Sequence, residues 1–134
     1  MTSKVTYEGN LRTRCTHIRS GDEFITDAPI DNNGKGEAFS PTDTVATALA
    51  SCMFTVMGIK AQNIDIDLTG AIASVTKIMA SDPRRISKIL VVFDIPVFTS
   101  EKNQKILEHT ANTCPVFYSL HPDIVMDIQF NWGV

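Results

Sequence analysis

The sequence predicts an α+β fold, and three observations carry this prediction. Segments rich in β-branched residues gather in the first thirty residues and again in the middle of the chain. Helical patterns separate and follow these two groups, and a final alternating segment closes the chain. The predicted order is βββ-α-ββ-α-α-β, without internal repeats or a linker. Because 134 residues is the length of one domain, we expect a single domain over residues 1–134.

The first group of segments has the pattern of a small sheet. Lys4–Tyr7 and Leu11–Ile18 flank a glycine-containing turn, which is typical of a hairpin, and Glu23–Thr26 follows a second turn. Residues 31–36 read Asp-Asn-Asn-Gly-Lys-Gly, a polar segment that predicts a loop.

The next segment carries the clearest start signal of a helix. Ser40 is suited to cap the helix, Pro41 suits its first position, and the Asp43 carboxylate can reach back as in a capping box. From there to Gln62 the helix is apolar on almost every side. Such a helix belongs in the middle of a structure, and a domain this small has difficulty covering it. We therefore expect a second subunit to cover it in a two-fold symmetric dimer.

The apolar stretch of the same helix is too short for a membrane anchor. Its longest apolar stretch, Val45–Ile59, is 15 residues and contains several polar positions, whereas a span takes about 20 apolar residues. We expect a core helix and no membrane partner.

The second half predicts a hairpin, two helices and a strand. Residues 66–80 and 85–95 form the hairpin. A helix opens at Ser100 and is stopped by Pro115, which also starts a short helix, Pro115–Leu120. Ile124–Phe130 alternates as a half-buried strand does.

Composition and charge exclude several classes of protein. The chain is 43% apolar and 20% charged, which excludes a disordered segment. Twelve basic against fifteen acidic residues give a net charge of −3, so a nucleic-acid or anionic-membrane partner is not expected. The first residues lack the apolar run of a signal peptide, so we expect a cytoplasmic protein.

The three cysteines, Cys15, Cys52 and Cys114, are an odd number and unlike the even, dense cysteines of a stapled secreted domain. Cys114 precedes a helix start, where free amides and the helix dipole would lower its pKa; the alternative is a cysteine packed as a small hydrophobe. Cys52 lies among apolar helix neighbours that favour a core role, and its reactivity would require a cation facing it. The basic residues available for this are Arg12, Arg14, Arg19, Arg84 and Arg85.

Other chemistries lack a motif. The candidate metal ligands, Cys15, His17, His109, Cys114 and His121, have no CxxC or HExxH spacing, so we expect no metal site. The spacing does not favour a Cys–His nucleophile pair either. Residues 34–36 (Gly-Lys-Gly) do not fit a phosphate-binding glycine motif, and no organic cofactor is expected.

Two motifs resemble the OsmC/Ohr superfamily, the osmotically induced protein C and organic hydroperoxide resistance proteins. The first is Ser40-Pro41-Thr42-Asp43 followed by Cys52 on an Ala-rich helix, and the second is Cys114-Pro115-Val116. The likeness is to an OsmC-like branch outside Ohr proper. It implies an intertwined homodimer in which long cysteine helices lie at the centre, packed on antiparallel sheet.

The resemblance also implies a function. It points to a thiol-dependent peroxidase that prefers organic hydroperoxides to hydrogen peroxide. Cys52 matches the peroxidatic position and Cys114 the resolving one, so that Cys52 becomes a sulfenic acid and then a disulfide with Cys114. An external dithiol would reduce this disulfide, and neither metal nor organic cofactor is required. Cys15 lies outside both motifs and has no expected catalytic part.

The chain departs from the family pattern at the helix start. Ohr and OsmC branches carry glutamate where this chain has Thr42, and Asp43 matches an acidic position of a looser branch. For the activating arginine of the family we favour Arg14, then Arg12, with Glu37 as a residue that orients it. These departures leave two alternatives open. One is an OsmC-fold protein that binds a small hydrophobic or thiol-containing molecule with little peroxidase activity, and the other is a structural dimer with incidental cysteines.

Overall fold

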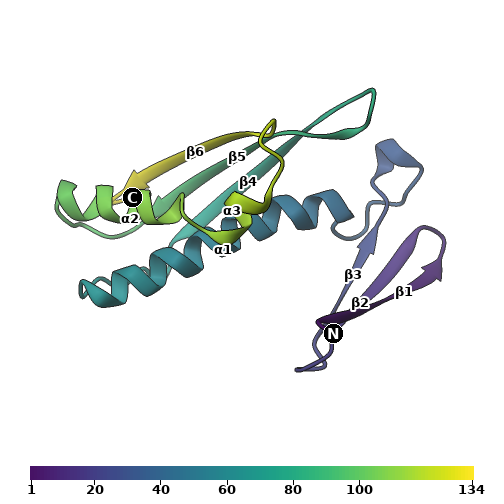
Figure 1. Ribbon diagram of the computed structural model, residues 1–134, viewed down its shortest axis with the longest axis horizontal. Coiled ribbons are helices and arrows are strands. Elements are labelled where there is room, and N and C mark those ends of the chain that lie inside the picture. Colours follow the sequence, from purple (N-terminus) through teal and green to yellow (C-terminus); the bar gives the residue numbers. More distant parts are fainter. The chain divides into compact units, whose positions relative to one another are not determined.

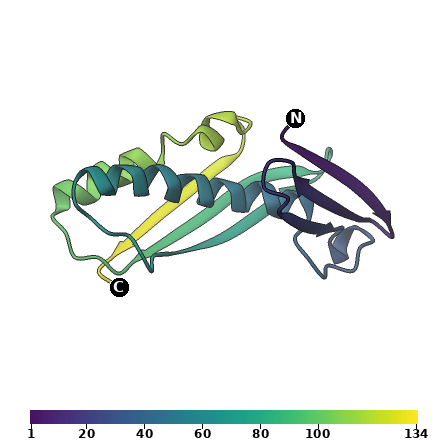
Figure 2. The same ribbon diagram turned by 90° about the horizontal axis from the view of Figure 1, so that it is seen from below.

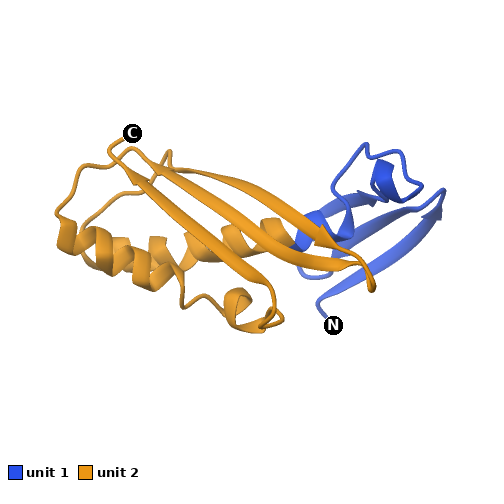
Figure 3. Ribbon diagram, turned by 90° about the horizontal axis from the view of Figure 1, so that it is seen from above, with its two compact units in different colours: residues 1–45 blue, residues 46–134 orange.

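A computed structural model describes residues 1–134. Its order of elements confirms the predicted βββ-α-ββ-α-α-β order and adds one short 3₁₀ helix, η1 (Figure 1). The chain forms two compact units, Met1–Val45 and Ala46–Val134, and each is described by itself (Figure 3). The elements are β1 (Ser3–Gly9), β2 (Arg12–His17), β3 (Glu23–Asp27), η1 (Ile30–Asn32), α1 (Pro41–Asn63), β4 (Ile72–Ala80), β5 (Arg85–Ile95), α2 (Glu101–Ala111), α3 (Pro115–Ser119) and β6 (Val125–Trp132).

The first unit is built on an antiparallel sheet of order β1-β2-β3. The segment that follows β3 folds back on the end of that strand, since the Asp27 amide donates to the carbonyl of Phe39. Gly34 allows this close return. A Cβ at position 34 would lie 1.7 Å from the Ala28 carbonyl oxygen. The predicted loop is therefore a tight, glycine-dependent turn around η1.

The second unit has a sheet of order β4-β5-β6, with α1 and α2 on one of its faces (Figures 2 and 3). β4 and β5 form the predicted hairpin. β6 pairs parallel to β5, so this sheet is mixed and not purely antiparallel as expected. The pairing is parallel because α2 and α3 connect the two strands. They return the chain to the end of the sheet at which β5 begins, as a parallel crossover requires.

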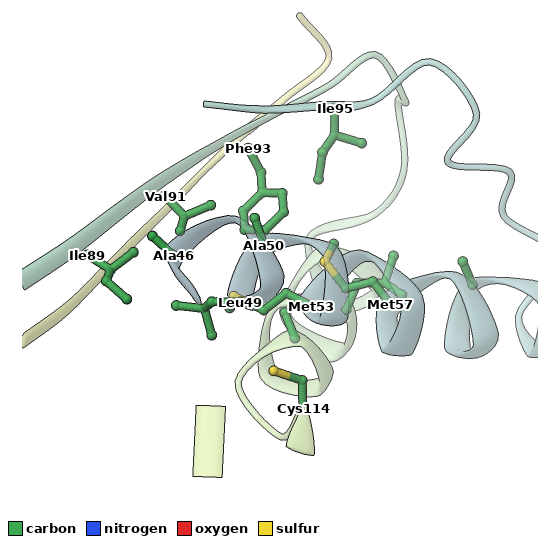
Figure 4. Close-up of a cluster of buried hydrophobic side chains, with 13 residues drawn as sticks. Ala46, Leu49, Ala50, Met53, Met57, Ile89, Val91, Phe93, Ile95 and Cys114 are labelled. Atoms are coloured by element: carbon green, nitrogen blue, oxygen red, sulfur yellow. The ribbon is translucent and has the colours of Figure 1, made fainter. Parts of the chain in front are cut away.

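The core of this unit lies between the sheet and α1. Alternate residues of β5 point into it, and α1 supplies small and flexible side chains opposite them (Figure 4). Phe93 stacks on Phe130 of β6 at 5.0 Å and meets Phe54 of α1 edge-on at 4.8 Å, which ties three elements together. The buried core residues are Ala46, Leu49, Ala50, Met53, Met57, Ala61, Ile89, Val91, Phe93, Ile95, Leu107, Ala111 and Cys114.

α1 is long and apolar enough to cross a membrane, judged by length and composition alone. Core helices pass the same test, and six residues of α1 belong to the buried core. Another face remains uncovered in the single chain, where Ile59 is 59% exposed and Val45 38%. The packing agrees with the predicted core helix and leaves an apolar surface for a further contact.

Several boundaries differ from the predicted ones, and two of these differences have a clear local cause. The strand expected from residue 66 begins only at Ile72, because residues 67–71 form turns in which the Asp67 carboxylate accepts from the Thr69 amide. The second helix ends at Ala111 and not against Pro115. Cys114 is extended (φ −67°, ψ 146°) because it begins the next helix, so the chain has to leave helical geometry before it.

Candidate functional site

Cys114 occupies the N-cap of α3, as its position before Pro115 predicts. Its Sγ accepts a hydrogen bond from the Phe117 amide at 3.3 Å. The side chain is fully buried within the core of the second unit (Figure 4). The cap therefore holds the sulfur in one place and away from solvent.

Burial decides the electrostatics of Cys114. It raises the pKa of the Cys114 thiol, and the neighbouring Cys52 adds to this rise. The amides of Phe117 and Val116 oppose the rise but do not overcome it. The expectation of a lowered pKa at this helix start is therefore wrong, because loss of water outweighs the two amides. Cys114 is held as the protonated thiol.

Cys52 lies in the middle of α1, half-buried and packed against the same core. It is 62 positions from Cys114 in the sequence, yet it lies close enough to the Cys114 thiol to raise the pKa of that thiol. The geometry thus joins the two motif cysteines in one cluster. Of the two, Cys52 is the one that solvent reaches, and Cys114 is fully buried.

The start of α1 is a reciprocal capping box. Ser40 Oγ accepts from the Asp43 amide at 3.0 Å, and the Asp43 carboxylate accepts from the Ser40 amide at 2.9 Å. The Thr42 hydroxyl lies 3.2 Å from the same Ser40 oxygen. The predicted capping role of Asp43 is confirmed, and Thr42 takes part in the same turn.

Arg12 of β2 forms a bidentate ion pair with Asp27 in the first unit. Its Nε and Nη2 donate to the two carboxylate oxygens of Asp27 at 2.7 and 2.8 Å, and Nη2 also donates to Glu37 at 3.4 Å. The pair raises the pKa of Arg12 above its already high value and lowers the pKa of Asp27. The predicted link between Glu37 and the arginine is present, and it is made to Arg12.

Arg14 lies on the same face of β2 but in a different setting. It donates to Glu8 at 3.2 Å and to Glu23 at 3.0 Å, with one bond to each carboxylate. Its side chain is 43% exposed, and those two bonds raise its pKa. This is a surface charge cluster, which solvent screens.

Asp27 is the residue of this region that sequence reasoning missed. It is 3% exposed and is the only charged side chain in the buried set. The predicted strand stopped at Thr26, which left Asp27 in a loop. The sequence did contain a signal for this residue. Antiparallel pairing of β2 with β3 places the acidic Asp27 opposite the basic Arg12.

The remaining candidates do not assemble into a site. Cys15 is half-buried on β2, in register with Val5 and Phe24. His17 bonds to Ser20, and His121 lies near Asp123. No group of three or more His, Cys, Asp or Glu side chains is arranged to hold a metal ion.

The chain matches a known protein family and a closely similar solved structure. A family model described as OsmC-like protein matches residues 34–129. A solved structure of a candidate osmotic stress induced and detoxification response protein from Psychrobacter arcticus 273-4 is 54% identical, with a TM-score of 0.95 over 98% of this chain and 96% of that one. No curated protein matches the chain.

Two more distant structures show the same fold. An organic hydroperoxide resistance protein, OsmC, from Legionella pneumophila is 14% identical, with a TM-score of 0.76 over 98% of this chain and 97% of that one. OhrB of Bacillus subtilis is 18% identical, with a TM-score of 0.71 over 98% of both chains. At these identities the likeness concerns the fold alone.

Proposed function

Because the chain belongs to the OsmC-like protein family, we propose that it is a thiol-dependent peroxidase that reduces organic hydroperoxides. The observation that carries the proposal is the contact between Cys52 and Cys114 within one core. Two structural relatives are organic hydroperoxide resistance proteins, which supports organic hydroperoxides as the substrate class.

The different settings of the two sulfurs divide the chemistry between them. Cys114 is buried and kept protonated, so attack on the peroxide falls to the more accessible Cys52. The Cys52 thiolate attacks the terminal peroxide oxygen, the O–O bond breaks, and the alkoxide leaves as an alcohol after taking a proton. Cys52 is then a sulfenic acid.

Resolution uses the neighbouring thiol. The Cys114 sulfur attacks the sulfenic sulfur, a disulfide forms, and the sulfenic oxygen leaves as water. An external dithiol then reduces the disulfide and is itself oxidised, which returns both cysteines to thiols. No metal or organic cofactor enters these steps.

The identity of the arginine that would activate Cys52 stays a prediction, and Arg14 and Arg12 are the two candidates. The sequence favours Arg14, but Arg12 is the arginine with a two-bond carboxylate partner and with Glu37 beside it. A fixed guanidinium is better suited than a screened surface one to stabilise a thiolate. Asp43 would act indirectly, through the cap of the helix that carries Cys52.

A homodimer of single-domain chains, each spanning residues 1–134, is the proposed assembly. Its support is the uncovered apolar face of α1, on which Ile59 is 59% exposed. A second copy would cover this face and would narrow the approach to Cys52. We place the dimer in the cytoplasm, where a dithiol reductant is available.

Peroxide consumption tests the proposal. With dithiothreitol as reductant, the wild-type protein should consume tert-butyl hydroperoxide faster than hydrogen peroxide, and Cys52→Ser should consume neither. Cys15→Ser is the matched control and should keep wild-type rates, because Cys15 lies outside both cysteine motifs. Wild-type protein that consumes neither peroxide above background would refute the peroxidase. It would favour an OsmC-fold protein that binds a small hydrophobic or thiol-containing molecule.

A further inference from the structure

A groove of the second unit lies between the last turn of α1 and the outer face of α2. The two helices lie side by side on one face of the sheet (Figures 2 and 3). The groove has a volume of about 660 Å³ and is lined by Lys60, Lys102, Lys105, Ile106, His109 and Thr110. Neither Cys52 nor Cys114 lines it, and Lys60 follows Cys52 by about 12 Å along the axis of α1. The groove is therefore separate from the cysteine cluster.

The groove carries an excess of positive charge. Lys105 pairs with Glu101 at 3.1 Å, and Glu101 is the only carboxylate at the groove. Both side chains of this pair are largely exposed, so the pair is neutral and screened by solvent. Lys60 and Lys102 have no carboxylate partner within the chain. Two ammonium groups thus remain uncompensated on a chain whose net charge is −3.

The two uncompensated lysines differ in burial and come from different helices. Lys60 lies in the last turn of α1 and is half-buried, whereas Lys102 lies in the first turn of α2 and is exposed. The aliphatic stem of a half-buried lysine packs along apolar surface and leaves its ammonium group at the water boundary. Each ammonium group has three N–H donors, and without a carboxylate beside it these donors are free for an anion.

The floor of the groove is apolar. Ile106 and Thr110 lie one turn apart on α2 and are half-buried, whereas Lys102, Lys105 and His109 are exposed along the rim. An apolar group that lies on Ile106 and on the Thr110 methyl group would lose contact with water. The volume is that of a site for a small organic molecule. The groove therefore combines a cationic rim with an apolar floor.

We propose that this groove binds a soluble organic phosphate monoester, with the phosphate between Lys60 and Lys102 and the apolar group on Ile106. A phosphate monoester carries nearly two negative charges at neutral pH, which matches the two uncompensated ammonium groups, whereas a carboxylate carries one. A second copy of the chain fits less well, because two-fold pairing through the groove would bring lysines against lysines. The apolar strip with Ile59, about 100° around α1 from Lys60, stays available for the dimer.

Calorimetric titration with hexyl phosphate, in a low-salt buffer that contains no phosphate, tests the proposal. Hexyl phosphate should bind about tenfold or more tightly than inorganic phosphate, because it alone buries an alkyl chain. It should also bind more tightly than heptanoate, which has a similar chain and a single charge. Lys60→Gln and Lys102→Gln should each weaken its binding about threefold or more. Lys4→Gln, which removes an exposed lysine of β1, is the matched control and should bind as wild type does.

Ile106→Thr separates the floor from the rim. It should weaken the binding of hexyl phosphate and leave that of inorganic phosphate unchanged, because only the alkyl chain lies on this residue. The location is checked without any variant, by acetylation of lysines followed by mass spectrometry. Hexyl phosphate should protect Lys60 and Lys102 and leave Lys4 reactive.

Four results would overturn the proposal. Inorganic phosphate that binds as tightly as hexyl phosphate would reveal an anion held by surface charge alone, and heptanoate that does so would remove the need for a dianion. Lys60 and Lys102 that resist acetylation without ligand would show that a second copy already covers the groove. Binding to vesicles of phosphatidic acid without binding of hexyl phosphate would assign the groove to a membrane surface. These measurements use neither peroxide nor dithiol, so their outcome is independent of the proposed peroxidase.

Discussion

A cysteine at a helix start is commonly read as an activated thiol, and Cys114 shows how burial reverses this. Its Sγ accepts a hydrogen bond from the Phe117 amide, yet the side chain has no contact with solvent and the pKa of its thiol is raised. The same residue is then poorly suited to attack a peroxide but well placed to attack an oxidised neighbour. The protonation of this one group sets the proposed order of events at the cluster.

Replacement of Cys114 should therefore interrupt the cycle after its first step. Cys114→Ser should consume about one equivalent of tert-butyl hydroperoxide, and excess peroxide should convert Cys52 to sulfinic acid. Intact-mass spectrometry would record a gain of two oxygens. Cys15→Ser, treated identically, should show a disulfide and no such gain. Undiminished multi-turnover activity of Cys114→Ser would contradict its resolving role.

Asp27 gives a pH dependence with a definite sign. Arg12 lowers the pKa of Asp27 below its ordinary value of 3.8, so the folded state favours the carboxylate. The stability from this pair is complete above that ordinary value and is lost as pH falls through the lowered one. In urea unfolding, wild type should be more stable than Asp27→Asn at pH 7. This difference should shrink below about pH 4, and a difference that widens in acid would contradict the assignment.

At the scale of the elements, the sequence predicted the features that depend on contacts between residues close together in the chain. The capping box at Ser40 and the N-cap at Cys114 follow from neighbouring residues, and both are present. The parallel pairing of β6 with β5 did not follow, because alternation in a strand is the same for either direction of its partner. Asp27 was missed for a related reason. A strand end that carries a charged residue looks like a loop until its opposite strand is known.

The capping box offers a stability test at this scale. Ser40→Ala removes the acceptor for the Asp43 amide in a buried turn, and it should lower the free energy of unfolding by about 1 kcal/mol. Thr47→Ala, at an exposed position of α1, is the control and should change stability little. Equal effects of the two substitutions would show that the cap contributes no more than an ordinary helix position.

For the whole molecule, the open question is what covers α1. The core takes one face of this helix, and an apolar strip with Ile59 remains outside it. A strip of this kind on the central helix would be costly if it stayed in water. The sequence already indicated this uncovered face, since a domain this small has difficulty covering a helix that is apolar on almost every side.

A charge on that apolar strip of α1 tests whether the strip is the dimer interface. Ile59→Glu should shift the protein from dimer to monomer in sedimentation equilibrium, because a carboxylate would be buried without a partner. Thr76→Glu, at an exposed position of β4, should sediment as wild type does. A wild-type protein that is monomeric at all concentrations, or an Ile59→Glu protein that remains dimeric, would place the interface elsewhere.

The distance in sequence between Cys52 and Cys114 has one more consequence. A bond between them would close a loop of about 60 residues, which restricts the unfolded chain and is worth about 4 kcal/mol. Each oxidation would thus make the protein harder to unfold and slower to digest, and each reduction would undo this. Resistance to a protease would then report how much oxidant a population of these molecules has met and not yet discharged.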